Sequence, residues 1–132
     1  MKIESKKVSV NAPAQTVYDY VSNLNNFREL LPQDRIAEWE SDTDWCSFKV
    51  QGTATISLKI KESTPPNSLV LENGETTPFP ITVHIHIRDV DGGSEAYQQV
   101  VAEVNPFMKM MVEKPLHNLF DFIADRLQEK FG

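Results

Sequence analysis

Two histidines, His84 and His86, lie two residues apart in a stretch of alternating hydrophobic and polar residues. In a strand, residues i and i+2 point to the same face, so the two imidazoles have a spacing that suits two ligands of one metal ion. The same face carries Thr82 and Arg88, and isoleucines occupy the opposite face, so we expect these histidines to face solvent. No Cys, Asp or Glu is placed to complete a coordination set, and we therefore predict no metal site.

The single cysteine, Cys46, falls on the hydrophobic face of the alternating stretch 45–50. A nucleophilic cysteine needs a base beside it, and no inward histidine is predicted, so we expect a buried thiol that packs as a small hydrophobic residue. Acid–base catalysis would need two inward carboxylates, and the predicted inward positions contain none. The polar candidates for an enzymatic site are Gln98, Tyr97, Cys46 and Tyr20, and we predict no catalytic residue among them.

The composition is that of an ordinary globular domain, with 132 residues, 40% hydrophobic residues and 24% charged residues. The net charge of −6 argues against a nucleic-acid surface, which needs clustered Lys and Arg. No hydrophobic run approaches the roughly 20 residues of a spanning helix, and residues 1–5 carry no signal-peptide pattern. We expect one cytoplasmic domain over residues 1–132, with no integral membrane segment and no cofactor.

The chain opens with one predicted strand, residues 2–10, followed by two short helices. Asn11-Ala12-Pro13 is a typical helix start, with proline in the first turn. The hydrophobic face of this first helix is predicted to consist of Val17, Tyr20, Val21 and Leu24. The second helix buries Phe27, Leu30 and Leu31, and ends at Pro32.

The middle of the chain has a period of two, which predicts strands. One face of each strand is hydrophobic and the other polar, as in an antiparallel sheet with one wet side. Asp91-Gly92-Gly93-Ser94 is a strong hairpin signal. The predicted strands cover residues 36–40, 45–50, 53–61, 69–73, 81–88 and 96–104.

The 27 residues from Asn105 to Phe131, close to the end of the chain, are predicted to form one long helix. Asn105 suits the N-cap and Pro106 the first helical position. A hydrophobic stripe then follows at helical spacing. Pro115 lies inside the helix and is predicted to kink it near Met111. The stripe consists of Leu116, Leu119, Phe120, Ile123, Ala124 and Leu127.

This order of elements resembles the START-like superfamily, also called SRPBCC, which includes polyketide cyclases. The resemblance is carried by residues 10–21, Val-Asn-Ala-Pro-Ala-Gln-Thr-Val-Tyr-Asp-Tyr-Val, by residues 26–32, Asn-Phe-Arg-Glu-Leu-Leu-Pro, and by Asn105-Pro106-Phe107. It implies an α+β helix-grip fold, in which a curved antiparallel sheet of about seven strands grips the C-terminal helix. Members bind lipids, sterols or polyketides, act as cyclases or aromatases, or act on protein partners, so the resemblance implies a cavity and leaves the chemistry open.

The space between sheet and helix is the predicted pocket, because short side chains cannot fill a sheet that curves around one helix. Its hydrophobic lining predicts binding or carriage of a small hydrophobic ligand, lipid or polyketide-like. Gln98 shares a face with Val100 and either orients a ligand's polar end or lies at a wet edge. A protein-interaction module, a homodimer through an edge strand, and a cyclase-type enzyme are alternatives. The predicted ligand-binding residues are Phe27, Leu31, Phe48, Ile56, Leu58, Phe79, Val83, Ile85, Gln98, Val100, Met108, Met111, Val112 and Leu119.

Overall fold

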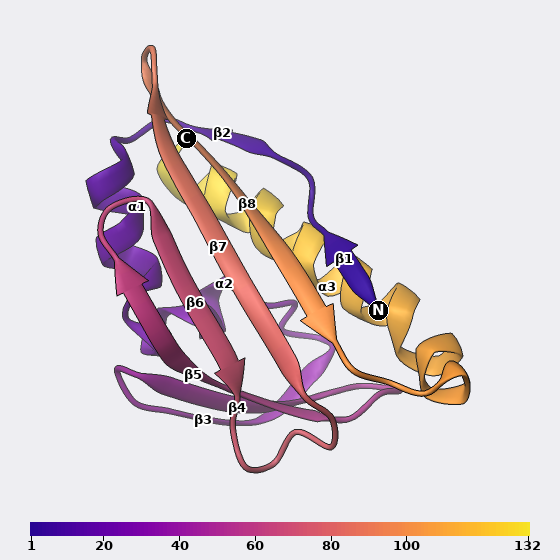
Figure 1. Ribbon diagram of the computed structural model, residues 1–132. Coiled ribbons are helices and arrows are strands. Elements are labelled where there is room, and N and C mark those ends of the chain that lie inside the picture. The colour runs from indigo at the N-terminus through magenta and orange to yellow at the C-terminus, as the bar shows by residue number, and fades with distance from the viewer.

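The computed structural model describes all residues, 1–132, and has an eight-stranded sheet with a long C-terminal helix (Figure 1). In chain order the elements are β1 (Lys2–Glu4), β2 (Val8–Val10), α1 (Ala14–Val21), the 3-10 turn η1 (Leu24–Asn26), α2 (Phe27–Leu30), β3 (Ile36–Ser41), β4 (Trp45–Val50), β5 (Thr55–Thr64), β6 (Ser68–Asn73), β7 (Ile81–Val90), β8 (Gly93–Ala102) and α3 (Pro106–Phe131).

All strand pairs are antiparallel, in the order β1-β8-β7-β6-β5-β4-β3, with β2 also paired to β8. The longest ladder joins β7 to β8 through the predicted hairpin, in which Gly92 has a φ of 84°. Such a φ is costly for residues with a Cβ and suits glycine. The predicted α+β helix-grip layout is therefore confirmed, with a sheet that curves around the helix.

The first strand differs from the prediction, because residues 2–10 form two strands separated by a bulge. Glu4 pairs with Gln99 and Val8 pairs with Ala96, so three residues oppose two and the register shifts by one. At the bulge, the Ser5 hydroxyl accepts a hydrogen bond from the Gln98 N–H at 2.9 Å. A side chain thus takes the place of a backbone acceptor, which keeps both strands on β8.

Helix α1 begins without a local cap, because Pro13 at the N-cap position has no side-chain acceptor. The Ala14 N–H instead donates to Asp89 Oδ1 at the end of β7, at 2.8 Å. The hydrophobic face of α1 also includes buried Tyr18, which the prediction omits, and the predicted Tyr20 is half-buried and packs against the core. The predicted burial of Phe27, Leu30 and Leu31 is confirmed.

The strand boundaries differ from the expected ones mainly at β5 and β8. β5 continues to Thr64, past the predicted end at residue 61, across a register shift between Ile60 and Glu62. The shift explains the difference, since a bulge interrupts the alternation without ending the ladder. β8 begins at Gly93, three residues before its predicted start, and ends at Ala102.

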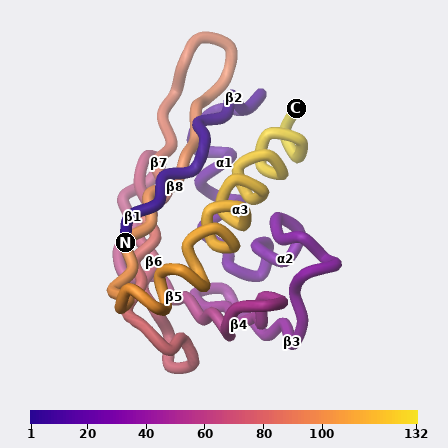
Figure 2. Tube along the Cα trace, turned by 90° about the vertical axis from the view of Figure 1, so that its right-hand side faces the viewer, coloured from indigo at the N-terminus to yellow at the C-terminus, as the bar shows by residue number.

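Helix α3 crosses the concave face of the sheet, with α1 and α2 beside it (Figure 2). The Asn105 side chain accepts from the Met108 N–H at 2.8 Å, which confirms the predicted N-cap. The helix is continuous through Pro115. Its predicted stripe is buried against the sheet and forms the core together with inward residues of β4 to β8. None of the helices combines the length and hydrophobicity needed to cross a membrane.

Candidate functional site

The candidate site is the space between the concave face of the sheet and α3. Alternation along β7 and β8 directs one side chain in two toward this space. Val83 and Ile85 point inward from β7, and Gln98 points inward from β8, all of them buried. Helix α3 closes the space with Leu119 and Ile123, and α2 closes its side with Phe27.

Two small voids remain in this space, each with a volume of about 10 Å³. Gln98 is the one residue in either lining that is not hydrophobic, and Phe27, Gln98 and Ile123 line both voids. The first void is also lined by Val21, Ile85, Ala96, Tyr97, Ala124 and Leu127. The second is also lined by Leu31, Cys46, Phe48, Leu58, Leu71, Val83, Leu119 and Phe120.

Gln98 lies inward and buried, which decides between its two expected placements. Its Nε2 donates to the Phe120 carbonyl oxygen of α3 at 3.2 Å. Its Oε1 is buried and has no hydrogen-bond partner. The side chain therefore links the sheet to the helix at one end and presents a free acceptor at the other.

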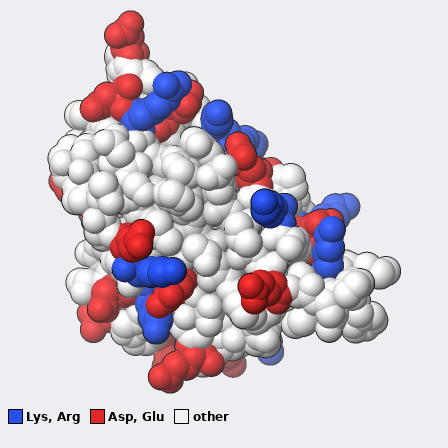
Figure 3. Space-filling view, in the orientation of Figure 1, with Lys and Arg blue, Asp and Glu red and all other residues white.

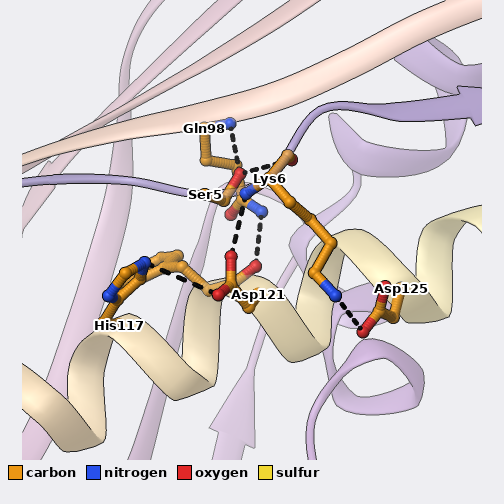
Figure 4. A network of polar contacts seen from close by, with 7 residues as sticks. Ser5, Lys6, Gln98, His117, Asp121 and Asp125 are labelled. Atoms are coloured by element: carbon orange, nitrogen blue, oxygen red, sulfur yellow. Dashed lines mark hydrogen bonds and ion pairs between the residues drawn. The ribbon is translucent and has the colours of Figure 1, made fainter.

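A polar network on the other side of Gln98 holds β1, β2 and α3 together (Figure 4). The Ser5 N–H donates to the Gln98 carbonyl at 2.9 Å, and the Lys6 N–H donates to Asp121 Oδ1 at 2.8 Å. Lys6 Nζ bonds Asp125 Oδ2 at 3.0 Å. The hydrogen bond that Lys6 donates to Asp125 raises the pKa of Lys6 above 10.5. The bulge at Ser5 thus positions both the backbone of Gln98 and the face of α3 that Gln98 contacts.

Most of the predicted ligand-binding residues lie inside, and eight of them border the voids. Those eight are Phe27, Leu31, Phe48, Leu58, Val83, Ile85, Gln98 and Leu119. Four others, Ile56, Phe79, Val100 and Val112, are buried but border neither void.

Of the last two predicted residues, Met108 and Met111, the structure corrects the inward placement of Met111, whereas Met108 packs in part against the core. Met111 is 50% exposed and Met108 only half-buried. Both lie on the side of the helix predicted to be buried, because Met108 precedes Val112 by four residues and Met111 is its neighbour in sequence. The first turns of α3 extend past the sheet, however, so that side has little to pack against (Figure 1).

The prediction missed nine lining residues, Val21, Cys46, Leu71, Ala96, Tyr97, Phe120, Ile123, Ala124 and Leu127. Helical spacing already indicated that the four from α3 are buried. Burial does not reveal which buried residues border a gap, since that depends on how neighbouring side chains interdigitate.

The polar candidates for catalysis do not form an acid–base pair. Burial raises the pKa of the Cys46 thiol to about 12, so it stays protonated near neutral pH. Tyr97 stacks on His86 on the outer face, with ring centroids 4.7 Å apart. Tyr20 lies at the edge of the core, where burial and the nearby Glu29 raise its pKa.

His84 and His86 share the outer face of β7, as the alternation predicts. Their ring centroids are 3.8 Å apart, and burial together with the nearby His86 lowers the pKa of His84 below 6.5. His84 bonds the Ser68 hydroxyl and His86 bonds the Gln99 Oε1, each at 2.7 Å. No group of three His, Cys, Asp or Glu side chains is arranged to hold a metal ion.

Two larger hollows open directly to solvent and differ in character from the interior. One, of about 520 Å³, lies beside β4 and β5 and is lined by Trp45, Lys59 and the acidic residues Glu40, Asp44 and Glu75, among others. The other, of about 560 Å³, lies at the β7–β8 hairpin and is lined mainly by polar residues. Neither has the hydrophobic lining that the sequence predicts for the ligand site.

The first turns of α3 expose hydrophobic side chains. Phe107 is 71% exposed and Met110 is 84% exposed. Figure 3 shows mainly uncharged atoms where α3 begins, at the lower right of the view. We call Phe107, Met110 and Met111 the apolar tip of α3.

The chain has the same fold as several solved structures but little sequence similarity to them. The solution structure of the KanY protein has a TM-score of 0.79 at 11% identity, over 99% of this chain and 97% of that one. The XoxI protein of Bacillus cereus has a TM-score of 0.75 at 12% identity, over 98% and 94%. Protein CV1439 of Chromobacterium violaceum has a TM-score of 0.74 at 11% identity, over 99% and 97%. Neither a protein-family model nor a curated protein sequence matches the chain.

Proposed function

We propose that this protein binds a small hydrophobic molecule, lipid or polyketide-like, between the concave face of its sheet and α3. The observation that carries the proposal is the pair of hydrophobic voids that share the lining residues Phe27, Gln98 and Ile123. Small-molecule sites typically have a hydrophobic lining with few polar groups, and here Gln98 is the single polar residue. The same fold also supports the proposal that the chain is a divergent member of the START-like superfamily.

Binding requires the interior to open, because two voids of about 10 Å³ are far smaller than any such ligand. The first half of α3 is the part best suited to move, since Val112 is its only fully buried residue. Pro115 has no N–H to donate to the Met111 carbonyl, so the helical ladder is weakest where the two halves join. This half lines neither void, so its displacement would open a route into the interior, and rotation of Phe27, which lines both voids, would join them.

The expected affinity is moderate. Each buried CH₂ contributes about 0.8 kcal/mol, so a ligand with about ten carbons gains roughly 8 kcal/mol before association costs. Opening the packed interior subtracts from this sum. We therefore expect dissociation constants in the micromolar range or weaker.

The first test is native mass spectrometry of freshly purified protein, followed by the same sample under denaturing conditions. A bound ligand gives an excess mass that disappears on denaturation and identifies the ligand class. If the native mass equals the sequence mass, titration with 2-naphthol, whose ring has ten carbons, shows whether an empty site exists. A protein that carries no ligand and does not bind this probe contradicts the proposal.

A matched pair of variants locates the binding. Val83→Phe adds a ring inside the second void, and Thr82→Phe adds the same ring on the opposite face of β7. We expect Val83→Phe to weaken 2-naphthol binding at least tenfold and Thr82→Phe to leave it unchanged. Circular dichroism checks that both variants fold. Equal effects of both substitutions would place the binding elsewhere.

A second candidate function is a protein-interaction module, and the apolar tip of α3 favours it. Monomeric proteins rarely expose large contiguous hydrophobic patches outside binding sites. The partner is a protein, with a homodimer as the simplest case. Sedimentation across a concentration range tests the homodimer, with Phe107→Ser and Met110→Ser together expected to abolish any self-association. A monomer at all concentrations would exclude the homodimer.

A further inference from the structure

The two ends of the Gln98 side chain have different environments. Nε2 donates to the Phe120 carbonyl at 3.2 Å, whereas Oε1 has no partner, and the residue is only 4% exposed. The amide cannot be turned around, because the Phe120 carbonyl oxygen accepts hydrogen bonds and would repel Oε1. The bond to α3 therefore leaves Oε1 as a buried, unpaired acceptor on a residue that lines both voids.

A buried acceptor without a partner costs stability, about 1–3 kcal/mol. Buried polar atoms nearly always have partners, so an orphan indicates a group that is absent from the protein itself. Water is a poor occupant of this position. Each void has about the minimum volume for one water molecule, and a buried water needs two to four polar partners. All other lining residues are hydrophobic, so a water here would have one.

We propose that Gln98 Oε1 accepts a hydrogen bond from the bound molecule, and that the ligand is accordingly a neutral hydrophobic alcohol or phenol. This inference rests on the proposed function and specifies its ligand class. A hydroxyl group supplies the single donor that Oε1 lacks. Esters and ethers supply no donor, and so leave Oε1 unpaired.

The lining also selects against charged ligands. A carboxylate would lie next to the partial negative charge of Oε1, and Nε2 is already bonded to the Phe120 carbonyl. An ammonium group would lose its hydration for one neutral acceptor. Burying a charge without a charged partner is strongly unfavourable, so neutral hydroxyl compounds are preferred over fatty acids and amines.

The experiment compares three probes with the same ring: 2-naphthol, 2-methoxynaphthalene and 2-naphthoate. Only the first carries a hydroxyl donor, the second replaces its hydrogen with a methyl group, and the third is an anion. Binding is measured by calorimetry or by the fluorescence of the naphthalene ring. We expect 2-naphthol to bind about tenfold tighter than 2-methoxynaphthalene, which corresponds to one hydrogen bond. We expect 2-naphthoate to bind more weakly than both.

Two variants assign the preference to Gln98. Gln98→Met keeps a side chain of similar length without the amide, and Gln99→Met makes the same change on the outer face of the same strand, where Gln99 contacts His86. In Gln98→Met the two neutral probes should bind equally well, while Gln99→Met should retain the tenfold preference. Because methionine leaves no buried polar atom unpaired, the Gln98 variant is expected to fold, which circular dichroism verifies.

The outcomes separate this inference from the proposed function. If the protein binds both neutral probes equally, the site exists and the assignment of Oε1 is wrong. If the preference for 2-naphthol persists in Gln98→Met, another group accepts the hydrogen bond and the assignment is again wrong. If none of the three probes binds, the proposed function fails, and this inference with it. A preference that depends on Gln98 alone supports both.

Discussion

The two halves of α3 have hydrophobic side chains in similar proportion but very different surroundings. The first half, Pro106–Lys114, buries one residue, Val112. The second half, Leu116–Phe131, buries six, and it lies across the concave face of the sheet (Figure 2).

Polar contacts differ between the halves in the same way. The second half bonds the backbone or side chains of other elements through Asp121, Asp125, Arg126, Gln128 and Lys130. The ion pair of the first half, between Lys109 and Glu113 at 3.6 Å, lies within the helix itself. The second half therefore stabilises the fold, and the first half is the part that the proposed ligand entry or partner contact would use.

Truncation of one hydrophobic side chain in each half gives the largest expected difference in stability. Leu116→Ala removes a fully buried side chain, so we expect the free energy of unfolding to fall by about 2–5 kcal/mol. Met111→Ala acts on a half-exposed residue, and the expected loss is below about 0.5 kcal/mol. Urea denaturation followed by circular dichroism measures both. A similar loss for the two variants would show that both halves stabilise the fold.

Removing one polar contact from each half of α3 should give a smaller difference in the free energy of unfolding. Asp121→Ala removes the acceptor of the Lys6 N–H at the bulge, and we expect a loss of about 1 kcal/mol in the free energy of unfolding. Glu113→Ala breaks the ion pair inside the first half, for which we expect less than about 0.5 kcal/mol. Asp121→Asn keeps an acceptor oxygen and should recover part of the loss. If Asp121→Ala were as stable as Glu113→Ala, the polar contacts of the second half would stabilise the fold no more than those of the first half.

The smallest expected effect is a pH dependence of the link between Lys6 and Asp125. The pKa of Lys6 is raised in the folded protein, so the unfolded chain releases this proton first as pH rises. The stabilisation is therefore fully present below pH 10.5 and is lost as pH rises through the folded pKa. Urea unfolding of the wild type and of Lys6→Gln is measured at several pH values between about 9.5 and 11.5. The free energies of unfolding of the two proteins should converge as pH rises. Parallel curves would mean that the pair does not stabilise the fold.

How far the sequence predicts the site depends on the kind of signal. The start of α3 was predictable to the residue, because Asn105 and Pro106 are strong local signals. The inward placement of Val83 and Ile85 followed from alternation. The exposure of Met111 did not, since its spacing fits the hydrophobic stripe and periodicity tells only which side a residue faces. Whether the sheet extends far enough to cover that side is a property of the whole fold.

The bulge at Ser5 was equally hidden. A hydroxyl that replaces a backbone acceptor leaves no periodic pattern, so residues 2–10 resemble one strand. The unpaired Oε1 of Gln98 could not be predicted either, because it depends on where the Phe120 carbonyl of α3 meets β8.

The bond between Ala14 and Asp89 has a consequence for the order in which the chain folds. Helix α1 has only 8 residues, too few to be stable alone in water. The acceptor for its first N–H is 75 residues further along the chain, at the end of β7. Such distant contacts form slowly, because a long loop must close first. During synthesis, the segment that becomes α1 therefore stays without stable helical structure until most of the sheet has left the ribosome.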